Sequence, residues 1–201
     1  MDLKQSKYKR CFVIGNGESL NKMDLSLLKD ELTIGCNSIC ISEFIPKFLC
    51  ISDPENFKRD KDDFITVNTN FVFASPPCVV PEGIEYHKVA LDRKESMLDA
   101  ASLDENFEKT YWARNVIIDM CIPLAHYLNI EKIYLIGIDG IKEGKYKHFY
   151  DTVIIPTNTD FVSYYNKIKE LYKGTIYDCT VNGYLTMFEK KDYLEVLNEK
   201  I

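Results

Sequence analysis

The sequence has neither the long apolar runs of a membrane protein nor the basic patches of a general nucleic-acid binder. No apolar run approaches the roughly 18 residues that a membrane-spanning helix needs, and no signal peptide precedes the first predicted strand. The net charge is −6, and lysine and arginine form no stripe with interleaved aromatic residues. We therefore expect a chain with no transmembrane segment and no nucleic-acid partner.

Common metal and catalytic signatures are also missing. The seven cysteines form no CxxC pair and lie mostly in apolar, strand-like runs, which predicts reduced core thiols in a cytoplasmic protein and no disulfide framework or metal site. The GxSxG elbow, the HExxH motif, the lysine of a P-loop and the third glycine of the dinucleotide fingerprint are absent. Nothing therefore supports a serine hydrolase of that type, a zinc protease, a P-loop NTPase or an NAD enzyme.

The 201 residues are enough for one domain with a full hydrophobic core, and the 46% hydrophobic content is that of a globular protein. Strands are predicted over residues 11–14, 33–36, 47–51, 70–74, 84–90 (as an edge strand), 132–138 and 175–179. Helical segments are predicted after Asp24 and over 111–128, 160–172 and 191–199, with a loop or lid over 91–109 and a mobile loop over 141–157. This alternation predicts a single α/β, Rossmann-like domain over 1–201, with a mostly parallel sheet and helices on both faces.

The most informative segment follows the first predicted strand, where residues 15–20 read GNGESL. Gly15 and Gly17 flank Asn16, and Ser19 stands where the next helix would begin. Such glycines let the backbone approach a ligand, and the helix N-terminus favours an anion. The alternative is a tight turn with no ligand.

Polar residues also follow the other predicted strands. They are Asn37, Ser38, Ser52, Asp53 and Asp139. Open α/β sheets bind ligands at the carboxyl ends of their strands, so these residues predict a nucleotide crevice, although each one alone also suits a turn or a helix cap. Arg114, near the start of the long helix, either meets a phosphate or pairs with an acidic residue. His148 is either a general base or an exposed loop histidine.

Several of these segments resemble motifs of the bacterial lipooligosaccharide sialyltransferases. Residues 15–20 are similar to GNGPSL with Glu18 in place of proline, and residues 35–38 (GCNS) are similar to a second-strand CN motif. Residues 133–139 (IYLIGID) resemble IYLSGID, and 158–160 an NTD motif. The segment from 176 to 188 resembles a wider family, which includes the MptE-type pterin diphosphokinases and the central domain of the Maf flagellin-glycosylation proteins.

The resemblance covers nearly the whole chain and implies a Rossmann-like fold with a nucleotide in the first crevice. In the sialyltransferases the donor is CMP-sialic acid, the asparagines of the first two motifs contact it, and no metal is needed. Two tyrosines bind its phosphate, and a histidine shortly before NTD is the base. Here Ile155 stands at that histidine's position. Tyr146 and Tyr150 become the phosphate-stabilising candidates, and His148 becomes the base candidate if the loop follows a different path.

Three hypotheses result. The first is a glycosyltransferase of surface glycan biosynthesis, with a nucleotide or nucleotide-sugar donor, CMP-activated, a glycan acceptor and no firmly implied cofactor. In it, His148 is catalytic and Tyr146 and Tyr150 stabilise the phosphate. Its nucleotide-binding residues are Gly15, Asn16, Gly17, Ser19, Asn37, Ser38, Asp53, Arg114 and Asp139. The second hypothesis is an MptE-type, Mg-ATP-dependent diphosphokinase with Asp53 or Asp139 on the metal. The third is an inactive nucleotide-binding module, which Ile155 favours.

Overall fold

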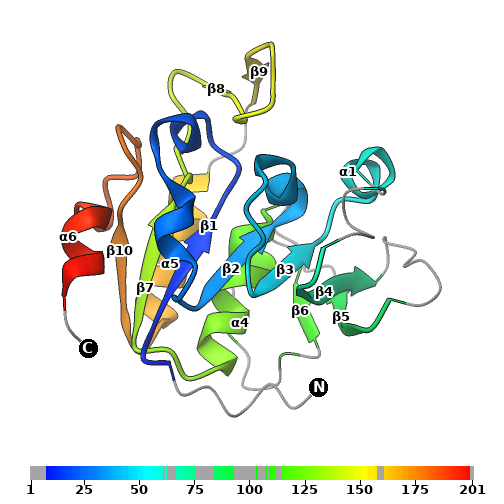
Figure 1. Ribbon diagram of the computed structural model, residues 1–201. Coiled ribbons are helices and arrows are strands. Elements are labelled where there is room, and N and C mark those ends of the chain that lie inside the picture. Colours follow the sequence, from blue (N-terminus) through cyan, green and yellow to red (C-terminus); the bar gives the residue numbers. More distant parts are fainter. Residues whose placement is uncertain are drawn as a thin grey trace.

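A parallel sheet of nine strands forms the centre of the molecule in this computed structural model (Figure 1). The structure describes residues 8–60, 62, 67–75, 84–92, 103, 107, 109–111, 115–157 and 161–199. The strands are β1 (Arg10–Ile14), β2 (Thr33–Cys36), β3 (Phe48–Ile51), β4 (Asn70–Ser75), β5 (Tyr86–Asp92), β6 (Lys109–Tyr111), β7 (Lys132–Ile136), β10 (Thr175–Asp178) and β11 (Glu189–Lys190). The predicted α/β class with a parallel sheet is confirmed.

The order of the strands places a reversal of direction at the middle of the sheet. The order is β11-β10-β7-β1-β2-β3-β4-β5-β6, so the chain steps one way from β1 to β6 and the other way from β7 to β11. In open α/β sheets such a reversal leaves a crevice outside the carboxyl ends of the two central strands. Those strands are β1 and β7, which precede residues 15–20 and Asp139.

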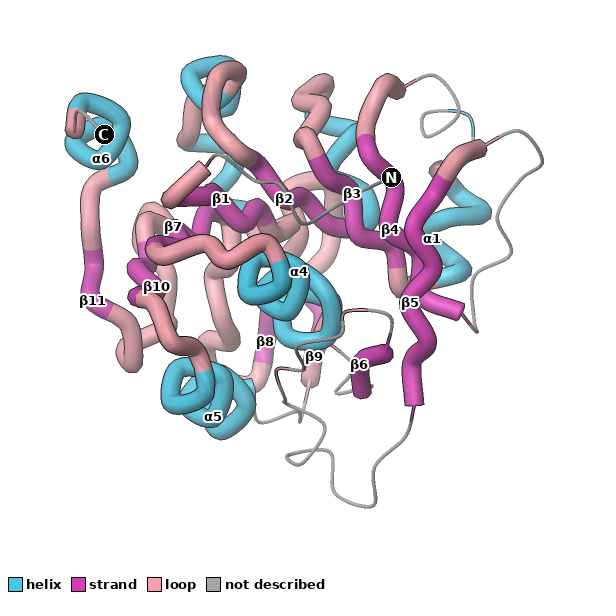
Figure 2. The backbone as a smooth tube through the Cα atoms, turned by 90° about the horizontal axis from the view of Figure 1, so that it is seen from below, coloured by secondary structure: helices cyan, strands magenta, loops and turns pink. Residues whose placement is uncertain are grey.

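Helices and helical turns cover both faces of the sheet, and Figure 2 shows α4 and α5 on one side with α6 on the other. The turns are η1 (Glu18–Lys22), η2 (Leu25–Leu28) and η3 (Asn37–Ser42), and the π-helical segment is η4 (Ile117–Cys121). The α-helices are α1 (Pro54–Arg59), α4 (Ile122–Tyr127), α5 (Phe161–Leu171) and α6 (Tyr193–Asn198). A two-stranded antiparallel hairpin, β8 (Lys145–Tyr146) with β9 (Ile155–Pro156), rises above the top edge of the sheet in Figure 1.

The two-residue period of β1 explains why both faces are covered. Cys11 and Val13 join the core beneath η4, α4 and α5, whereas Phe12 and Ile14 join the core beneath η1, η2, η3 and α6. All four side chains are fully buried. A strand buried on both faces reads as a continuous apolar run, which is the pattern that predicted it.

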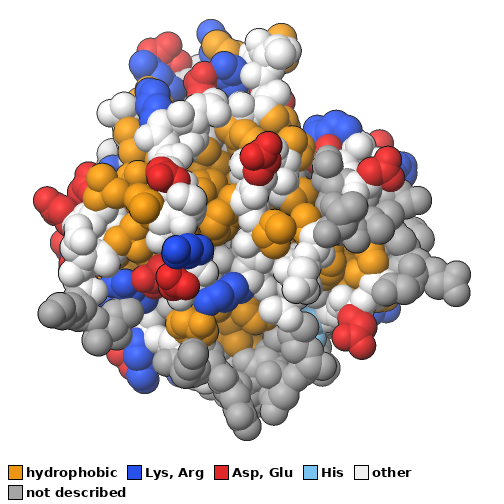
Figure 3. Space-filling view, in the orientation of Figure 1, with side chains coloured by type: hydrophobic (Ala, Val, Ile, Leu, Met, Phe, Trp, Pro, Cys, Tyr) orange, Lys and Arg blue, Asp and Glu red, His pale blue; other side chains and the backbone are white. Residues whose placement is uncertain are grey.

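The second face is covered by short turns instead of long helices. Apolar side chains therefore reach the surface across that face, as Figure 3 shows. Among them Leu27, Ile41 and Ile45 remain 46%, 37% and 47% exposed. The two faces of the sheet are thus unequally covered.

Two predicted elements differ from the structure, and some elements were not predicted. The strand predicted as an edge, β5, pairs with β4 on one side and β6 on the other, so the edge lies at β6. The helix predicted over 111–128 begins only at Val116, because Tyr111 ends β6. The strands β6 and β11, the β8–β9 hairpin and the helix α1 were not predicted. Most of the predicted loop over 91–109, together with Arg114 and residues 158–160, lies outside the described residues.

The predicted break at Pro123 is present and has a clear cause. Proline has no N–H to donate to the carbonyl group one turn earlier. The preceding turn widens into the π-helical segment η4, in which Ile122 N donates to Ile117 O five residues back, and the α-helical pattern then resumes.

Candidate functional site

A cavity of about 630 Å³ lies at the carboxyl ends of β1, β2, β3 and β7, where the strand order predicts a crevice. This volume is within the usual range for small-molecule sites. The sequence-predicted residues that line it are Gly15, Asn16, Gly17, Asn37, Ser52, Asp53, Asp139, Tyr146 and His148. Ser19, Ser38 and Tyr150 are not among the lining residues, and Arg114 is outside the described part of the chain.

The backbone N–H groups of the glycine-flanked loop point at the protein itself. Gly15 N donates to Ile136 O at 2.8 Å, and Gly17 N donates to Gly137 O at 2.7 Å. Ser19, at the start of η1, donates its N–H to Asp139 Oδ2 at 3.0 Å and its hydroxyl to Asp139 Oδ1. The anion that the sequence predicts at this helical turn is therefore supplied by the chain's own Asp139.

The glycines allow the loops after β1 and β7 to cross at close range. A Cβ atom on Gly15 would lie 2.4 Å from Gly137 O, and one on Gly17 would lie 2.3 Å from Asp139 Oδ1. Any larger residue would push the two loops apart. Close packing of two loops, and not the approach of a ligand, requires glycine at both positions.

The loop after β7 is held by the C-terminal segment of the chain. Tyr184 N donates to Asp139 O at 2.7 Å, and Ile138 N donates to Thr180 Oγ1 at 3.2 Å. Burial raises the pKa of Asp139 above its ordinary value, although the two donors of Ser19 lower it. The segment after β10 thus braces the loop after β7.

Two asparagine side chains reach the cavity from β1 and β2. Asn16 Nδ2 donates to Cys36 O at 3.2 Å, and Asn16 Oδ1 is buried without a hydrogen-bond partner among the described residues. Asn37 adopts a left-handed conformation with φ 41°, and its Oδ1 accepts from Ser52 N at 3.2 Å. Asn37 lines the cavity, and among the described residues no hydrogen bond engages its N–H₂ group, which is therefore available as a donor.

The β8–β9 hairpin closes one side of the cavity. Tyr146 pairs with Ile155 across the hairpin, and His148 forms an isolated antiparallel bridge with Gly17. Phe149 N also donates to Asn16 O at 2.8 Å, so the predicted loop is fastened to the loop after β1. This path brings His148 to the cavity and leaves Ile155 out of its lining.

The imidazole of His148 lies between two tyrosines and beside a carboxylate. Its ring stacks on Tyr150 at 5.1 Å and meets Tyr146 edge-on at 5.1 Å. Its Nδ1 lies 2.7 Å from Asp151 Oδ2. Burial raises the pKa of Tyr146, and the charges of Asp151 and Asp53 raise it further, so this phenol stays protonated as a donor.

Ser38 and Tyr150 belong to a network behind the hairpin. Ser38 is fully buried and donates its hydroxyl to Asp60, while Arg59 Nη2 donates to Ser38 Oγ at 2.6 Å and to Asp60 Oδ2 at 2.7 Å. The Arg59 guanidinium also lies 4.9 Å from the centre of the Tyr150 ring. The network joins α1 and η3 to the segment that carries His148.

Removing the hydroxyl of Ser38 should therefore cost stability. We expect Ser38→Ala to lower the free energy of unfolding by about 1–3 kcal/mol, because Asp60 is only 4% exposed and loses a donor. Ser42→Ala is the matched control, since its half-buried hydroxyl only donates to Ile39 O, and it should cost less than about 1 kcal/mol. Urea unfolding measures both, and equal stabilities of the two variants would contradict this interpretation of the network.

One wall of the cavity was not predicted. It is formed by Ile117, Phe161 and Tyr165, together with Asn115, whose Nδ2 donates to Tyr165 Oη at 3.5 Å. Tyr165 lies on the buried stripe of α5 with Ile168, so its spacing indicates only a core residue.

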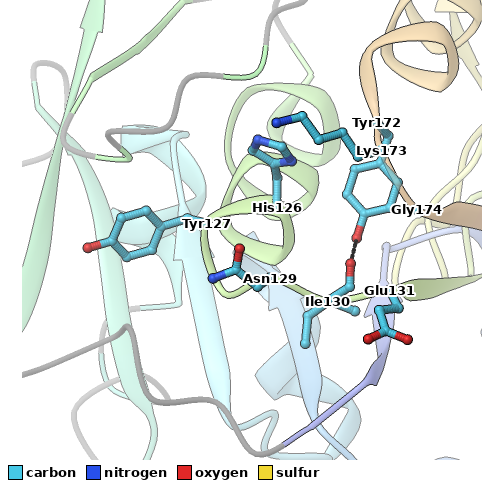
Figure 4. Close-up of a pocket in the computed structure, with 8 residues that line it drawn as sticks. All are labelled: His126, Tyr127, Asn129, Ile130, Glu131, Tyr172, Lys173 and Gly174. Carbon is cyan, nitrogen blue, oxygen red and sulfur yellow. Dashed lines mark hydrogen bonds between the residues drawn. The ribbon is translucent and has the colours of Figure 1, made fainter.

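A second pocket, of about 480 Å³, lies at the opposite end of the sheet (Figure 4). It is lined by His126, Tyr127, Asn129, Ile130, Glu131, Tyr172, Lys173 and Gly174. The Tyr172 hydroxyl donates to Ile130 O, which precedes β7, and Gly174 precedes β10. This pocket therefore lies at the amino ends of the strands, away from the predicted site residues.

The described side chains include histidine, carboxylate and thiol groups. No three His, Cys, Asp or Glu residues among them are grouped so as to hold a metal ion. The six described cysteines are buried free thiols, and burial raises the pKa of Cys179 to about 12; Cys78 lies outside the described residues. No described helix has both the length and the apolar character needed to cross a membrane.

Comparison with known proteins shows similarity to solved structures but not to known sequences. Neither a protein-family model nor a curated protein matches the sequence. Among solved structures, the sialyltransferase CstII from Campylobacter jejuni, in complex with the substrate analogue cytidine-5'-monophosphate, matches with a TM-score of 0.53 and 17% identity over 92% of this chain and 86% of that one. Two structures of a mammalian sialyltransferase, one of them in complex with Gal-beta-1-3GalNAc-ortho-nitrophenol, match at a TM-score of 0.36 and 11% identity. They cover 90% and 88% of this chain and 72% and 70% of theirs. The similarity to CstII shows that the chain has a sialyltransferase-like α/β fold.

Proposed function

We propose that this protein is a glycosyltransferase that moves a sugar from a CMP-activated donor to a hydroxyl group of a glycan acceptor, in the biosynthesis of a surface glycan. One observation carries the proposal. A single cavity at the strand reversal brings the amides of Asn16 and Asn37 together with the carboxylate-paired imidazole of His148. The fold shared with a sialyltransferase that was solved with cytidine monophosphate supports the choice of donor.

Each lining group suits a part of this reaction. The N–H₂ group of Asn37, whose Oδ1 is held by Ser52 N, can donate to a ribose or phosphate oxygen, and Asn16 lines the same cavity. Tyr146, with its raised pKa, remains a phenol and can donate to the phosphate as negative charge develops on it. Placing donors where charge develops is how such a site accelerates departure of the nucleotide.

In the proposed transfer, one proton moves, one bond forms and one bond breaks. The acceptor hydroxyl gives its proton to Nε2 of His148, and its oxygen forms the new bond to the anomeric carbon of the sugar. The bond from that carbon to the phosphate oxygen breaks, and its electron pair leaves with cytidine monophosphate.

Release of cytidine monophosphate tests the function directly. The purified chain is incubated with CMP-activated sugars and a panel of glycans, and free nucleotide is measured. Release that increases with acceptor concentration supports the proposal. Magnesium-dependent consumption of ATP would instead favour the diphosphokinase hypothesis, and nucleotide binding without turnover of any donor would favour an inactive module.

Asn37→Asp tests whether the Asn37 side chain binds the nucleotide. Aspartate keeps the oxygen that accepts from Ser52 N and tolerates the left-handed backbone, but it replaces the donating N–H₂ group with a negative oxygen. We expect the affinity for CMP to fall about ten- to a hundredfold, or about 1.5–3 kcal/mol, while thermal stability stays close to that of the parent.

Asn129→Asp provides the control for that variant. Asn129 also has a left-handed backbone, with φ 55°, and lies in the second pocket at the other end of the sheet. Its replacement should leave the affinity for CMP unchanged. Equal affinities of the Asn37 and Asn129 variants, measured by calorimetry, would remove Asn37 from the binding site.

A further inference from the structure

The side chain of Asp151 binds His148 in two ways. Its Oδ2 lies 2.7 Å from His148 Nδ1 and accepts from His148 N at 3.1 Å. The backbone closes the same turn, since Asp151 N donates to His148 O at 3.1 Å. The carboxylate therefore fixes both the loop and the ring.

This contact decides which ring nitrogen carries the proton. A carboxylate only accepts hydrogen bonds, so the neutral imidazole must present Nδ1–H to Asp151. The lone pair is then on Nε2, which has no hydrogen-bond partner among the described residues, while His148 lines the cavity. A base that removes a proton from an acceptor needs this tautomer.

Stacking on one face of the His148 ring also holds its orientation. Tyr150 stacks on the His148 ring with an angle of 19° between the planes, and Arg59 lies over the Tyr150 ring. Arg59 is itself bound to the buried Asp60. A half-turn of the imidazole would break the contact with Asp151, and a tilt of the ring would break the stacking on Tyr150.

We infer that Asp151 is a positioning residue that holds His148 in the Nδ1–H tautomer and stabilises the imidazolium formed when Nε2 takes a proton. The inference rests on the proposed function for its catalytic part. The tautomer does not depend on that function, because it can be measured in the protein without substrate.

The simpler interpretation is that Asp151 only closes the turn. That role predicts a loss of stability on substitution but no preference for one tautomer.

Nitrogen-15 NMR of the histidine rings, combined with turnover of the donor, separates the two interpretations. We expect the Nδ1–H tautomer of His148 in the parent protein. In Asp151→Asn, the new amide can donate to Nδ1, so the population should shift toward Nε2–H. A carboxylate-to-amide change behind a catalytic imidazole lowers turnover by up to about 10⁴-fold, and we expect a loss of at least about tenfold here.

Two further variants control for the loop itself. Asp151→Glu keeps the carboxylate and should retain the Nδ1–H tautomer with part of the turnover. Glu143→Gln, an exposed carboxylate-to-amide change in the same loop, should change neither the tautomer nor the rate. An Nε2–H tautomer in the parent, or unchanged turnover in Asp151→Asn, would overturn the inference. A parent protein with the Nδ1–H tautomer but no turnover of any donor would instead overturn the proposed function.

Discussion

Replacing His148 with asparagine is expected to lower the rate of sugar transfer by about 10²- to 10⁴-fold, with donor affinity little changed. The amide of asparagine occupies the place of Nδ1 and can still donate to Asp151, so the turn should remain intact. What the variant lacks is Nε2, the atom proposed to take the acceptor proton. Steady-state measurement of CMP release gives both kcat and KM.

His126→Asn is the matched control for that experiment. His126 lies in the second pocket, at the amino ends of the strands, and should affect neither kcat nor KM when it is replaced. If His148→Asn turned over the donor as fast as the parent protein, another group would have to be the base, and the assignment of His148 would be wrong.

The second large effect is expected on stability, at Gly15. The added methyl group of Gly15→Ala would lie 2.4 Å from Gly137 O and 2.9 Å from Ile138 Cγ1, and the closer of these is a backbone atom with little room to move. We expect a loss of about 3 kcal/mol, which corresponds to a decrease in Tm of about 6–12 °C for a chain of this size. Calorimetric melting measures the change.

Gly144→Ala separates the effect of crowding from that of backbone strain. Gly144 has φ +72°, but among the described residues a methyl group there meets only Thr157 O, at 3.4 Å. This variant should lose about 1–2 kcal/mol from strain alone. A Gly15→Ala protein that is no less stable than Gly144→Ala would show that the two loops do not cross as closely as described.

The central strands were predictable because burial on both faces leaves a strong local signal. Phe12 and Val13 belong to cores on opposite faces, so β1 reads as an uninterrupted apolar run. The position of β5 inside the sheet was not predictable in the same way. Its neighbour β6 contributes only Lys109–Tyr111, and pairing between segments distant in sequence leaves no local pattern.

The place of the cavity could be predicted, but the contacts within it could not. Polar residues at strand ends indicate a crevice, and Asn16, Asn37 and Asp139 do line it. The pattern of polar residues at strand ends did not indicate that Ser19 would donate to Asp139, 120 residues away in sequence. It also did not indicate that Ser38 would donate to Asp60. Both serines are short polar side chains after a strand, and their partners come from segments that only the folded sheet brings together.

Calorimetric titration with CMP and with ATP, each with and without magnesium, tests the central claim most directly. That claim is that the cavity at the carboxyl ends of β1, β2 and β7 holds the nucleotide part of a CMP-activated sugar. The account predicts that CMP binds with a 1:1 stoichiometry and the same affinity in the presence and absence of magnesium, and that ATP binds much more weakly. Binding of neither nucleotide, or binding of ATP only with magnesium, would contradict it.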